Sequence, residues 1–178
     1  MVGTRIAVML GVMALTRSMP VVAQNMSFGA DNFYRSNNVS IQPITFPNQF
    51  KMKLAGNLFI PKNLDTNVGA PAIVVGNPMG AVKEQSADVY ATKMAEKGFV
   101  TLSIDLTFWG GSDREPRNAV SGDLYSESFS AAVDYLSQRD VVDPERIGAL
   151  GICGSGSLCD QCCQNRFPNQ GCRHVFDV

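Results

Sequence analysis

Apolar residues recur at alternate positions between residues 39 and 60, and this alternation predicts a β-hairpin. Val39, Ile41 and Phe46 mark a first strand. A second strand covers 52–60, where every second residue is apolar or glycine, which is the period of a β-strand. Between the two strands, residues 47–49 (Pro-Asn-Gln) are of the types that form turns.

Beyond residue 71 the apolar residues fall into short continuous runs that alternate with amphipathic segments. The runs at 72–76, 99–106 and 147–152 predict buried strands, and the segments 85–97 and 123–136 predict helices between them. A strand–helix–strand–helix–strand order implies right-handed crossovers and a parallel sheet. We therefore predict an α/β fold with a mostly parallel sheet and the N-terminal antiparallel hairpin at its edge.

The composition is that of a globular protein. The 178 residues are 45% hydrophobic and 17% charged, with a formal net charge of −1, which is typical of a folded domain rather than a disordered segment. The sequence contains no run of Lys and Arg that would create a basic surface, so we exclude nucleic acid as a partner.

The first residues have the pattern of an export signal. Arg5 provides a positive charge, and 6–15 form an apolar run that is too short to span a bilayer. Residues 21–23 (Val-Val-Ala) are small and precede Gln24, as at a signal peptidase site. We predict a signal peptide over 1–23 and a mature protein that is periplasmic or secreted, with no membrane attachment after cleavage. The alternative is a buried N-terminal helix.

The third apolar run leads directly into 151–156, Gly-Ile-Cys-Gly-Ser-Gly. A nucleophile elbow is a tight strand-to-helix turn that holds its nucleophile on strained backbone between small residues. Gly151 and Ser155 meet this need around Cys153, and a helix N-terminus stabilises the nucleophilic thiolate form of a cysteine. Ser155 is the rival nucleophile, although the strand length favours Cys153. A glycine-rich turn that binds phosphate, or nothing, is the remaining alternative.

The loop after the first apolar run, 76–81, has the sequence Gly-Asn-Pro-Met-Gly-Ala. Where a nucleophile elbow is present, this loop supplies one backbone N–H of the oxyanion hole, and the residue after the nucleophile supplies the other. By position, these are the N–H groups of Met79 and Gly154. Without the elbow, the segment would be an ordinary strand-to-helix loop.

These segments resemble α/β-hydrolases related to the dienelactone hydrolase group. The resemblance rests on 76–81, on 105–110 (Asp-Leu-Thr-Phe-Trp-Gly) and on 151–156, and it covers roughly Val39 to Ser157. It implies an α/β-hydrolase-type sheet and hydrolysis of esters, lactones or similar acyl compounds. The expected partner is a small-molecule acyl substrate, and we expect neither a cofactor nor a metal.

Individual residues of these segments carry further expectations. Cys153 stands where dienelactone hydrolases also use a cysteine nucleophile, whereas family members often carry His at the position of Asn77. This departure concerns the side-chain contacts of the loop and not its backbone N–H. Phe108 and Trp109 follow the second buried strand and either line an acyl pocket or pack the loop. Asp105 is expected to hold loop backbone; the triad acid of this family follows the elbow.

After Ser157 the sequence changes character. Residues 158–178 hold four of the five cysteines and the single histidine, and they do not predict the amphipathic helix that should follow an elbow. A metal site is one explanation, because Cys-x-x-Cys with a later Cys and His has ligand spacing. Its ligands would be Cys159, Cys162, Cys172 and His174. A redox pair of the first two cysteines is another explanation.

A third explanation is a shift of reading frame. Read one base later, the permitted codons that follow Leu158 allow a helix-forming sequence such as Val-Ile-Ser-Ala-Ala-Lys-Ile-Asp. We therefore interpret 24–157 as the N-terminal part of an α/β-hydrolase domain and 158–178 as an aberrant tail translated out of frame, so that the sheet is incomplete at the C-terminus.

Besides a truncated hydrolase, the sequence allows two other functional interpretations. In hydrolases of this type the acid and the histidine follow the nucleophile along the chain, so we expect the fragment to be inactive. One alternative is an exported thiol or metal-binding protein that uses the Cys-rich tail. The other is a non-catalytic binding domain on the same fold, since the fold does not determine the function.

Overall fold

The computed structural model describes residues 34–65, 68–113 and 115–166, and the predicted signal peptide, Cys172 and His174 lie outside these ranges. In chain order the described elements are β1 (Val39–Pro47), β2 (Lys53–Pro61), β3 (Ala70–Gly76), α1 (Ser86–Ala95), β4 (Val100–Ile104), α2 (Gly122–Ser137), β5 (Val142–Gly151) and α3 (Ser155–Arg166). Within the described parts of the chain, no helix has the length and hydrophobicity needed to cross a bilayer.

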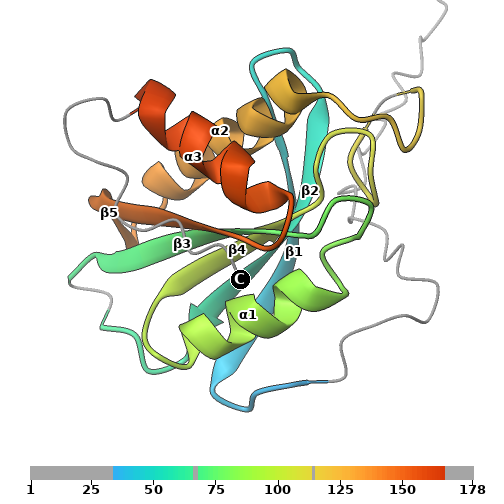
Figure 1. The fold of residues 1–178 in the computed structure, drawn as a ribbon. Coiled ribbons are helices and arrows are strands. Elements are labelled where there is room, and N and C mark those ends of the chain that lie inside the picture. The colour runs from blue at the N-terminus through green and yellow to red at the C-terminus, as the bar shows by residue number, and fades with distance from the viewer. Residues whose placement is uncertain (1–33, 66–67, 114, 167–178) are drawn as a thin grey trace, which may run out of the picture.

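The strands form a mixed sheet in the order β1-β2-β4-β3-β5 (Figure 1). β1 pairs antiparallel with β2, and β2 pairs antiparallel with β4. β3 lies between β4 and β5 and is parallel to both. The α/β fold predicted from the sequence is thereby confirmed, with the hairpin at one edge of the described sheet and β5 at the other.

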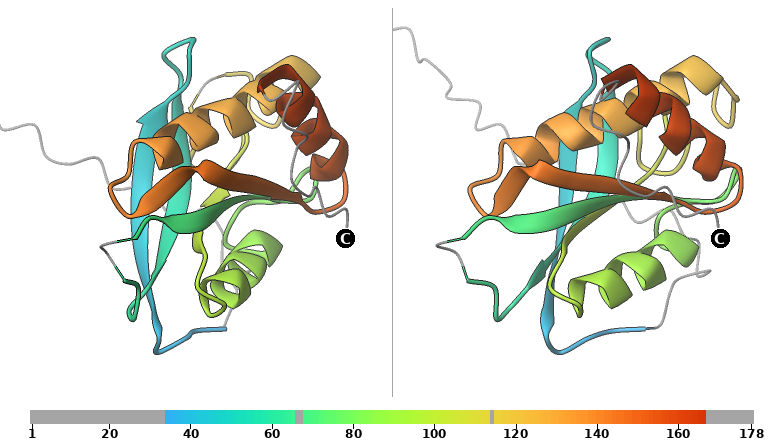
Figure 2. Two further views of the ribbon diagram at one scale, coloured as in Figure 1. Left: turned by 90° about the vertical axis from the view of Figure 1, so that its left-hand side faces the viewer. Right: turned by 60° about the vertical axis from the view of Figure 1, so that its left-hand side comes forward.

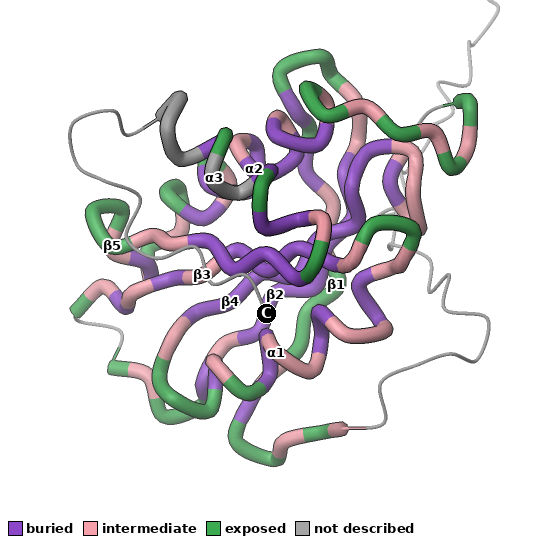
Figure 3. The backbone as a smooth tube through the Cα atoms, viewed as in Figure 1, coloured by how far each residue is buried: buried purple, intermediate pink, exposed green. Residues whose placement is uncertain are grey.

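Helices cover both faces of the sheet, with α1 on one face and α2 and α3 on the other (Figure 2). Two apolar clusters result: Leu54 and Leu58 of β2 belong to the cluster of Phe129 on α2, whereas Phe59 belongs to that of Ala91 on α1. Successive residues of a strand point to opposite faces. Because β2 lies inside the sheet and between the helix layers, both of its faces are buried (Figure 3).

The helix after the elbow extends farther than the sequence predicts. α3 runs from Ser155 to Arg166, so the first part of the tail is helical although its sequence lacks the expected amphipathic pattern. Leu158 and Cys162, which are 8% and 2% exposed, lie on its inner side, and Cys162 Sγ is 3.3 Å from Ser130 Oγ of α2. The helix contains no proline, and residues at i and i+4 lie on one face of a helix, so both side chains can be buried together.

A buried carboxylate joins α1 to the sheet. Asp88, in the first turn of α1, accepts hydrogen bonds from Asn57 Nδ2 on β2 (3.0 Å) and from Ser103 Oγ on β4 (2.6 Å). Burial disfavours the ionised carboxylate more strongly than these two hydrogen bonds favour it, and it raises the pKa of Asp88 to about 6. The contact between Asn57 and Asp88 explains why a polar residue stands in the middle of the mostly apolar strand β2.

The raised pKa of Asp88 predicts a pH-dependent stability. A carboxyl group that binds its proton more tightly in the folded chain contributes fully to the unfolding free energy below about pH 4, and this contribution is lost as the pH rises through about 6. We expect Asp88→Asn to gain stability relative to the wild type as the pH rises over this range. The gain has an upper limit of about 3 kcal/mol, because one pKa unit corresponds to about 1.4 kcal/mol.

Urea unfolding of the two proteins from acid to neutral pH measures this difference. Asp123→Asn is the control, since Asp123 is exposed in the first turn of α2. If the stability difference between Asp88→Asn and the wild type stays constant with pH, the carboxyl group of Asp88 does not have the role given to it.

Candidate active site

The turn between β5 and α3 places Cys153 on strained backbone. β5 ends at Gly151 and α3 begins at Ser155. Between them, Cys153 is exposed and has a φ of +57°, in the left-handed region that residues with a side chain rarely adopt. A Cβ atom at Gly151 would lie 2.5 Å from backbone atoms of Ser155 and Gly156. Strand and helix therefore approach too closely for a side chain, and the turn has to be tight.

The rival residue, Ser155, has a different environment. It is buried at the start of α3, and its Oγ donates a hydrogen bond to the backbone oxygen of Asn77 in the loop after β3. Gly76 makes this approach possible, because a Cβ there would lie 3.1 Å from Ser155 Cβ and 2.3 Å from Phe129 Cζ. The hydroxyl of Ser155 thus fastens the helix start to the loop, while the thiol of Cys153 faces outward.

The loop after β3 brings Met79 against the residue that follows Cys153. A Cβ at Gly154 would lie 3.3 Å from Met79 Cβ and Cε and 3.9 Å from Met79 N. Asn77, at the position where related proteins often carry His, donates from Nδ2 to Ala81 O within the same loop (3.0 Å). The structure therefore brings together the three residues that the sequence assigns to the nucleophile and the oxyanion hole.

Trp109 lies beside the same loop. Its indole N–H is within hydrogen-bonding distance of Tyr125 Oη (2.5 Å) and Ala119 O (3.1 Å). At the other end of the ring, Cη2 would be 3.7 Å from a Cβ at Gly80. Phe108 is partly exposed, with a φ of +76°. Trp109 thus packs the loop and also borders the segment that carries Met79.

The tail residues that the sequence suggests as metal ligands are only partly within the described ranges. Cys162 is buried against α2, whereas Cys172 and His174 lie outside. Among the residues that the structure describes, no group of three or more His, Cys, Asp or Glu side chains is arranged to hold a metal ion.

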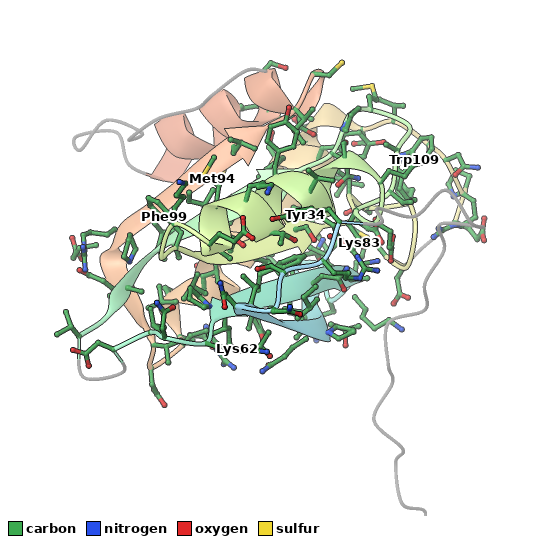
Figure 4. All side chains as sticks on the ribbon, turned by 90° about the horizontal axis from the view of Figure 1, so that it is seen from below. Tyr34, Lys62, Lys83, Met94, Phe99 and Trp109 are labelled. Carbon is green, nitrogen blue, oxygen red and sulfur yellow. The ribbon has the colours of Figure 1, made fainter. Side chains whose placement is uncertain are left out.

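A buried ion pair joins the loops after β3 and β4. Asp105, which directly follows β4, is fully buried. Its carboxylate accepts hydrogen bonds from Lys83 Nζ (2.7 Å), Lys83 N (2.8 Å) and Gly111 N (2.9 Å). A Cβ at Gly110 would lie 2.3 Å from this carboxylate. The prediction that Asp105 holds loop backbone is confirmed, and Figure 4 shows Lys83 and Trp109 towards the same end of the molecule.

The sequence did not reveal Lys83 as a buried residue. Lys83 is 1% exposed, and its ammonium also contacts Glu84 Oε1 at 2.6 Å. Burial lowers the pKa of Lys83, but the carboxylates of Asp105 and Glu84 outweigh this effect and hold the pKa above its usual value. A Lys-Glu pair before a helix is usually solvated. The sequence signal for a buried cation was Asp105, because an acidic residue directly after a buried strand needs a partner of opposite charge.

Removal of Asp105 would leave the Lys83 ammonium buried beside Glu84 alone. We expect Asp105→Ala to lower the unfolding free energy by about 3 kcal/mol, as is typical of a broken buried ion pair. Asp113→Ala is the matched control, because Asp113 lies in the same loop and its ion pair with Lys53 (3.3 Å) is well exposed. The control should lose less than about 1 kcal/mol. Urea unfolding measures both losses, and equal values would contradict the role of Asp105.

Comparison with known proteins agrees with this fold. The Dienelactone hydrolase family matches residues 54–168, which is more than half of the chain. The uncharacterized protein PA2218 of Pseudomonas aeruginosa is 48% identical over 126 residues, which are 71% of this chain and 34% of the relative. The crystal structure of PA2218 has a TM-score of 0.72 at 44% identity, over 78% of this chain and 44% of that chain.

Two fungal proteins extend the comparison. The thiohydrolase aneE of Aspergillus aculeatus is 31% identical over 106 residues, which are 60% of this chain and 32% of the relative. The α/β-hydrolase GrgF of Penicillium sp. sh18 shares the fold, with a TM-score of 0.64 at 23% identity over 69% of this chain and 41% of that chain. The chain spans about a third of the length of the curated relatives, 34% of PA2218 and 32% of aneE. As the resemblance of its loops predicted, the chain belongs to the dienelactone hydrolase family and has the α/β-hydrolase fold.

Proposed function

We propose that this protein acts on esters, lactones, thioesters or similar acyl compounds through a covalent acyl intermediate on Cys153. The observation that carries the proposal is the backbone of Cys153, an exposed residue with a φ of +57° between a strand and a helix. Strain of this kind is retained where the surrounding structure enforces it, and it occurs preferentially at functional sites. A nucleophile elbow requires this conformation.

The chemical step uses groups that lie at the turn. The thiolate of Cys153 attacks the carbonyl carbon, a C–S bond forms, and the carbonyl π electrons move to oxygen. The backbone N–H groups of Met79 and Gly154 would stabilise this oxyanion, supported by the position of Met79 against Gly154. When the oxyanion collapses, the bond to the leaving group breaks and the alkoxide or thiolate departs, leaving a thioester on the enzyme.

The name of one relative and a chemical argument support thioesters within this substrate class. The relative aneE is named a thiohydrolase. In addition, attack of a thiolate on a thioester replaces one C–S bond by another, so acylation of a cysteine is nearly balanced in energy. The export pattern over 1–23 supports a periplasmic or secreted location, where the protein would meet its small-molecule acyl substrate.

Release of the acyl group needs a base that activates water. In α/β-hydrolases this base is a histidine that follows the nucleophile along the chain. The chain has a single histidine, His174, which lies outside the described residues. The acylation step, by contrast, uses groups that the structure describes, and it is the step that the assay below measures.

An active-ester assay tests this proposal. With p-nitrophenyl acetate, we expect a burst of about one equivalent of p-nitrophenolate per chain and the mass gain of one acetyl group. The rate should exceed that of N-acetylcysteine by about 100-fold, which is the value of one oxyanion-hole donor. Cys153→Ala should abolish the burst. Ser155→Ala should retain it, because the Ser155 hydroxyl bonds to backbone inside the protein.

Cys162→Ala is the matched cysteine control, since Cys162 is a buried thiol on α3. Peptide mapping then locates the acetyl group. Labelling that persists in Cys153→Ala on the tail cysteines would show that Cys153 is not the nucleophile. A loss in Ser155→Ala as large as that in Cys153→Ala would assign the nucleophile to Ser155.

A further inference from the structure

An exposed apolar side chain, Met79, lies against the residue that follows the candidate nucleophile. Among the described residues, the large apolar side chains that remain exposed are Ile41, Phe50, Val68, Met79 and Val120. Met79 is 47% exposed and Val120 is 61% exposed. Met79 belongs to the loop after β3, which contacts the elbow, and Val120 belongs to the loop after β4. The other three lie on the hairpin or before β3.

A chain of contacts connects these side chains with the elbow. Met79 Cε lies against Gly154, the neighbour of Cys153, and the ring of Trp109 lies against Gly80, the neighbour of Met79. The indole N–H of Trp109 is bonded to Ala119 O, directly before Val120. Contacts thus run from Gly154 to Met79, from Gly80 to Trp109, and from Trp109 to the backbone directly before Val120. We name Met79, Trp109 and Val120 the apolar strip.

The apolar strip is held in place from behind. Tyr125 of α2 is buried; its hydroxyl contacts the indole nitrogen of Trp109 (2.5 Å) and donates to Ala119 O (2.7 Å). These contacts fix both the ring and the segment before Val120. The charges of Lys83 and Asp105 are buried and paired with each other at 2.7 Å, so they do not offer a partner to an incoming anion.

From this arrangement we infer that the acyl group of the substrate is apolar and extended, and that it lies along the apolar strip with its carbonyl carbon at Cys153. This inference rests on the function proposed above and adds the class of acyl group: an aliphatic chain of several methylene groups, in preference to acetyl or to a carboxylate-bearing chain. Each methylene group removed from water on the strip favours acylation, and the flexible thioether of Met79 adapts to chains of different shape.

Three active esters test the inference on the 178-residue protein. They are p-nitrophenyl acetate, p-nitrophenyl hexanoate and the p-nitrophenyl monoester of adipic acid, which has the length of hexanoate with a terminal carboxylate. Each burst rate is divided by the rate of the same ester with N-acetylcysteine, which removes the intrinsic reactivity of the ester. We expect hexanoate to exceed acetate by about ten-fold on this scale, as partial burial of its extra methylene groups predicts, and the adipate monoester to remain near acetate.

Two exposed side chains of the apolar strip provide the variants. Met79→Ala and Val120→Ala should each lower the hexanoate-to-acetate ratio by about three-fold, which is roughly the effect of one buried methylene group. The backbone N–H of residue 79 remains in the first variant, and neither side chain belongs to the buried core. Phe50→Ala is the matched control, because Phe50 is an apolar side chain of similar exposure, 54%, in the hairpin turn; its ratio should equal that of the wild type.

The outcomes separate the inference from the proposed function. A normal burst at Cys153 with equal scaled rates for acetate and hexanoate overturns the inference and leaves the nucleophile in place. A preference for the adipate monoester, or a ratio that Phe50→Ala lowers as much as Met79→Ala, also overturns it. Absence of a burst with all three esters overturns the proposed function, and the inference with it.

Discussion

The close approach of β5 and α3 is the constraint on which the candidate site depends. No Cβ atom fits at Gly151, because it would lie 2.5 Å from the backbone of α3. The chain must therefore reverse within a short turn, and the left-handed backbone of Cys153 is the result. The same helix start is bonded through Ser155 Oγ to the loop after β3. This close approach thus determines the position of the Cys153 thiol and the position of the loop after β3 beside it.

Buried charges join the loops after β3 and β4. Asp105 bonds to both the backbone and the ammonium of Lys83, and also to the backbone of Gly111. A buried ion pair adds little net stability, since desolvation offsets most of its Coulombic attraction. Its effect here is on geometry: two loops that contribute apolar side chains to the surface are held at a fixed distance. The buried ion pair of Lys83 and Asp105 therefore holds together the two loops whose side chains Met79 and Val120 are exposed at the surface.

The sequence predicted those features that local geometry dictates. The strands and the helices α1 and α2 have distinct apolar periods, and the elbow has glycine where no side chain fits. Features that depend on distant partners were not predictable. Burial of Lys83 follows from Asp105, which lies on another loop. The helical start of the tail depends on Leu158 and Cys162, whose contact with α2 is not visible in a polar sequence. The strained turn at Cys153 and the pairing of Met79 with Gly154, in contrast, follow from the elbow pattern of the sequence, and the folded chain adds their geometry.

Trp109 is the single tryptophan of this chain, and its position gives the protein a built-in optical reporter. Tryptophan emission responds to the polarity around the indole ring and to its hydrogen bonds. The indole N–H contacts Tyr125 and Ala119, and the ring borders Gly80 in the loop that carries Met79. Tryptophan fluorescence from the folded protein therefore originates where the loop after β4 packs on the main apolar cluster and on the loop after β3. A change in the position of the loop that carries Met79 would therefore alter this emission, without attachment of a dye.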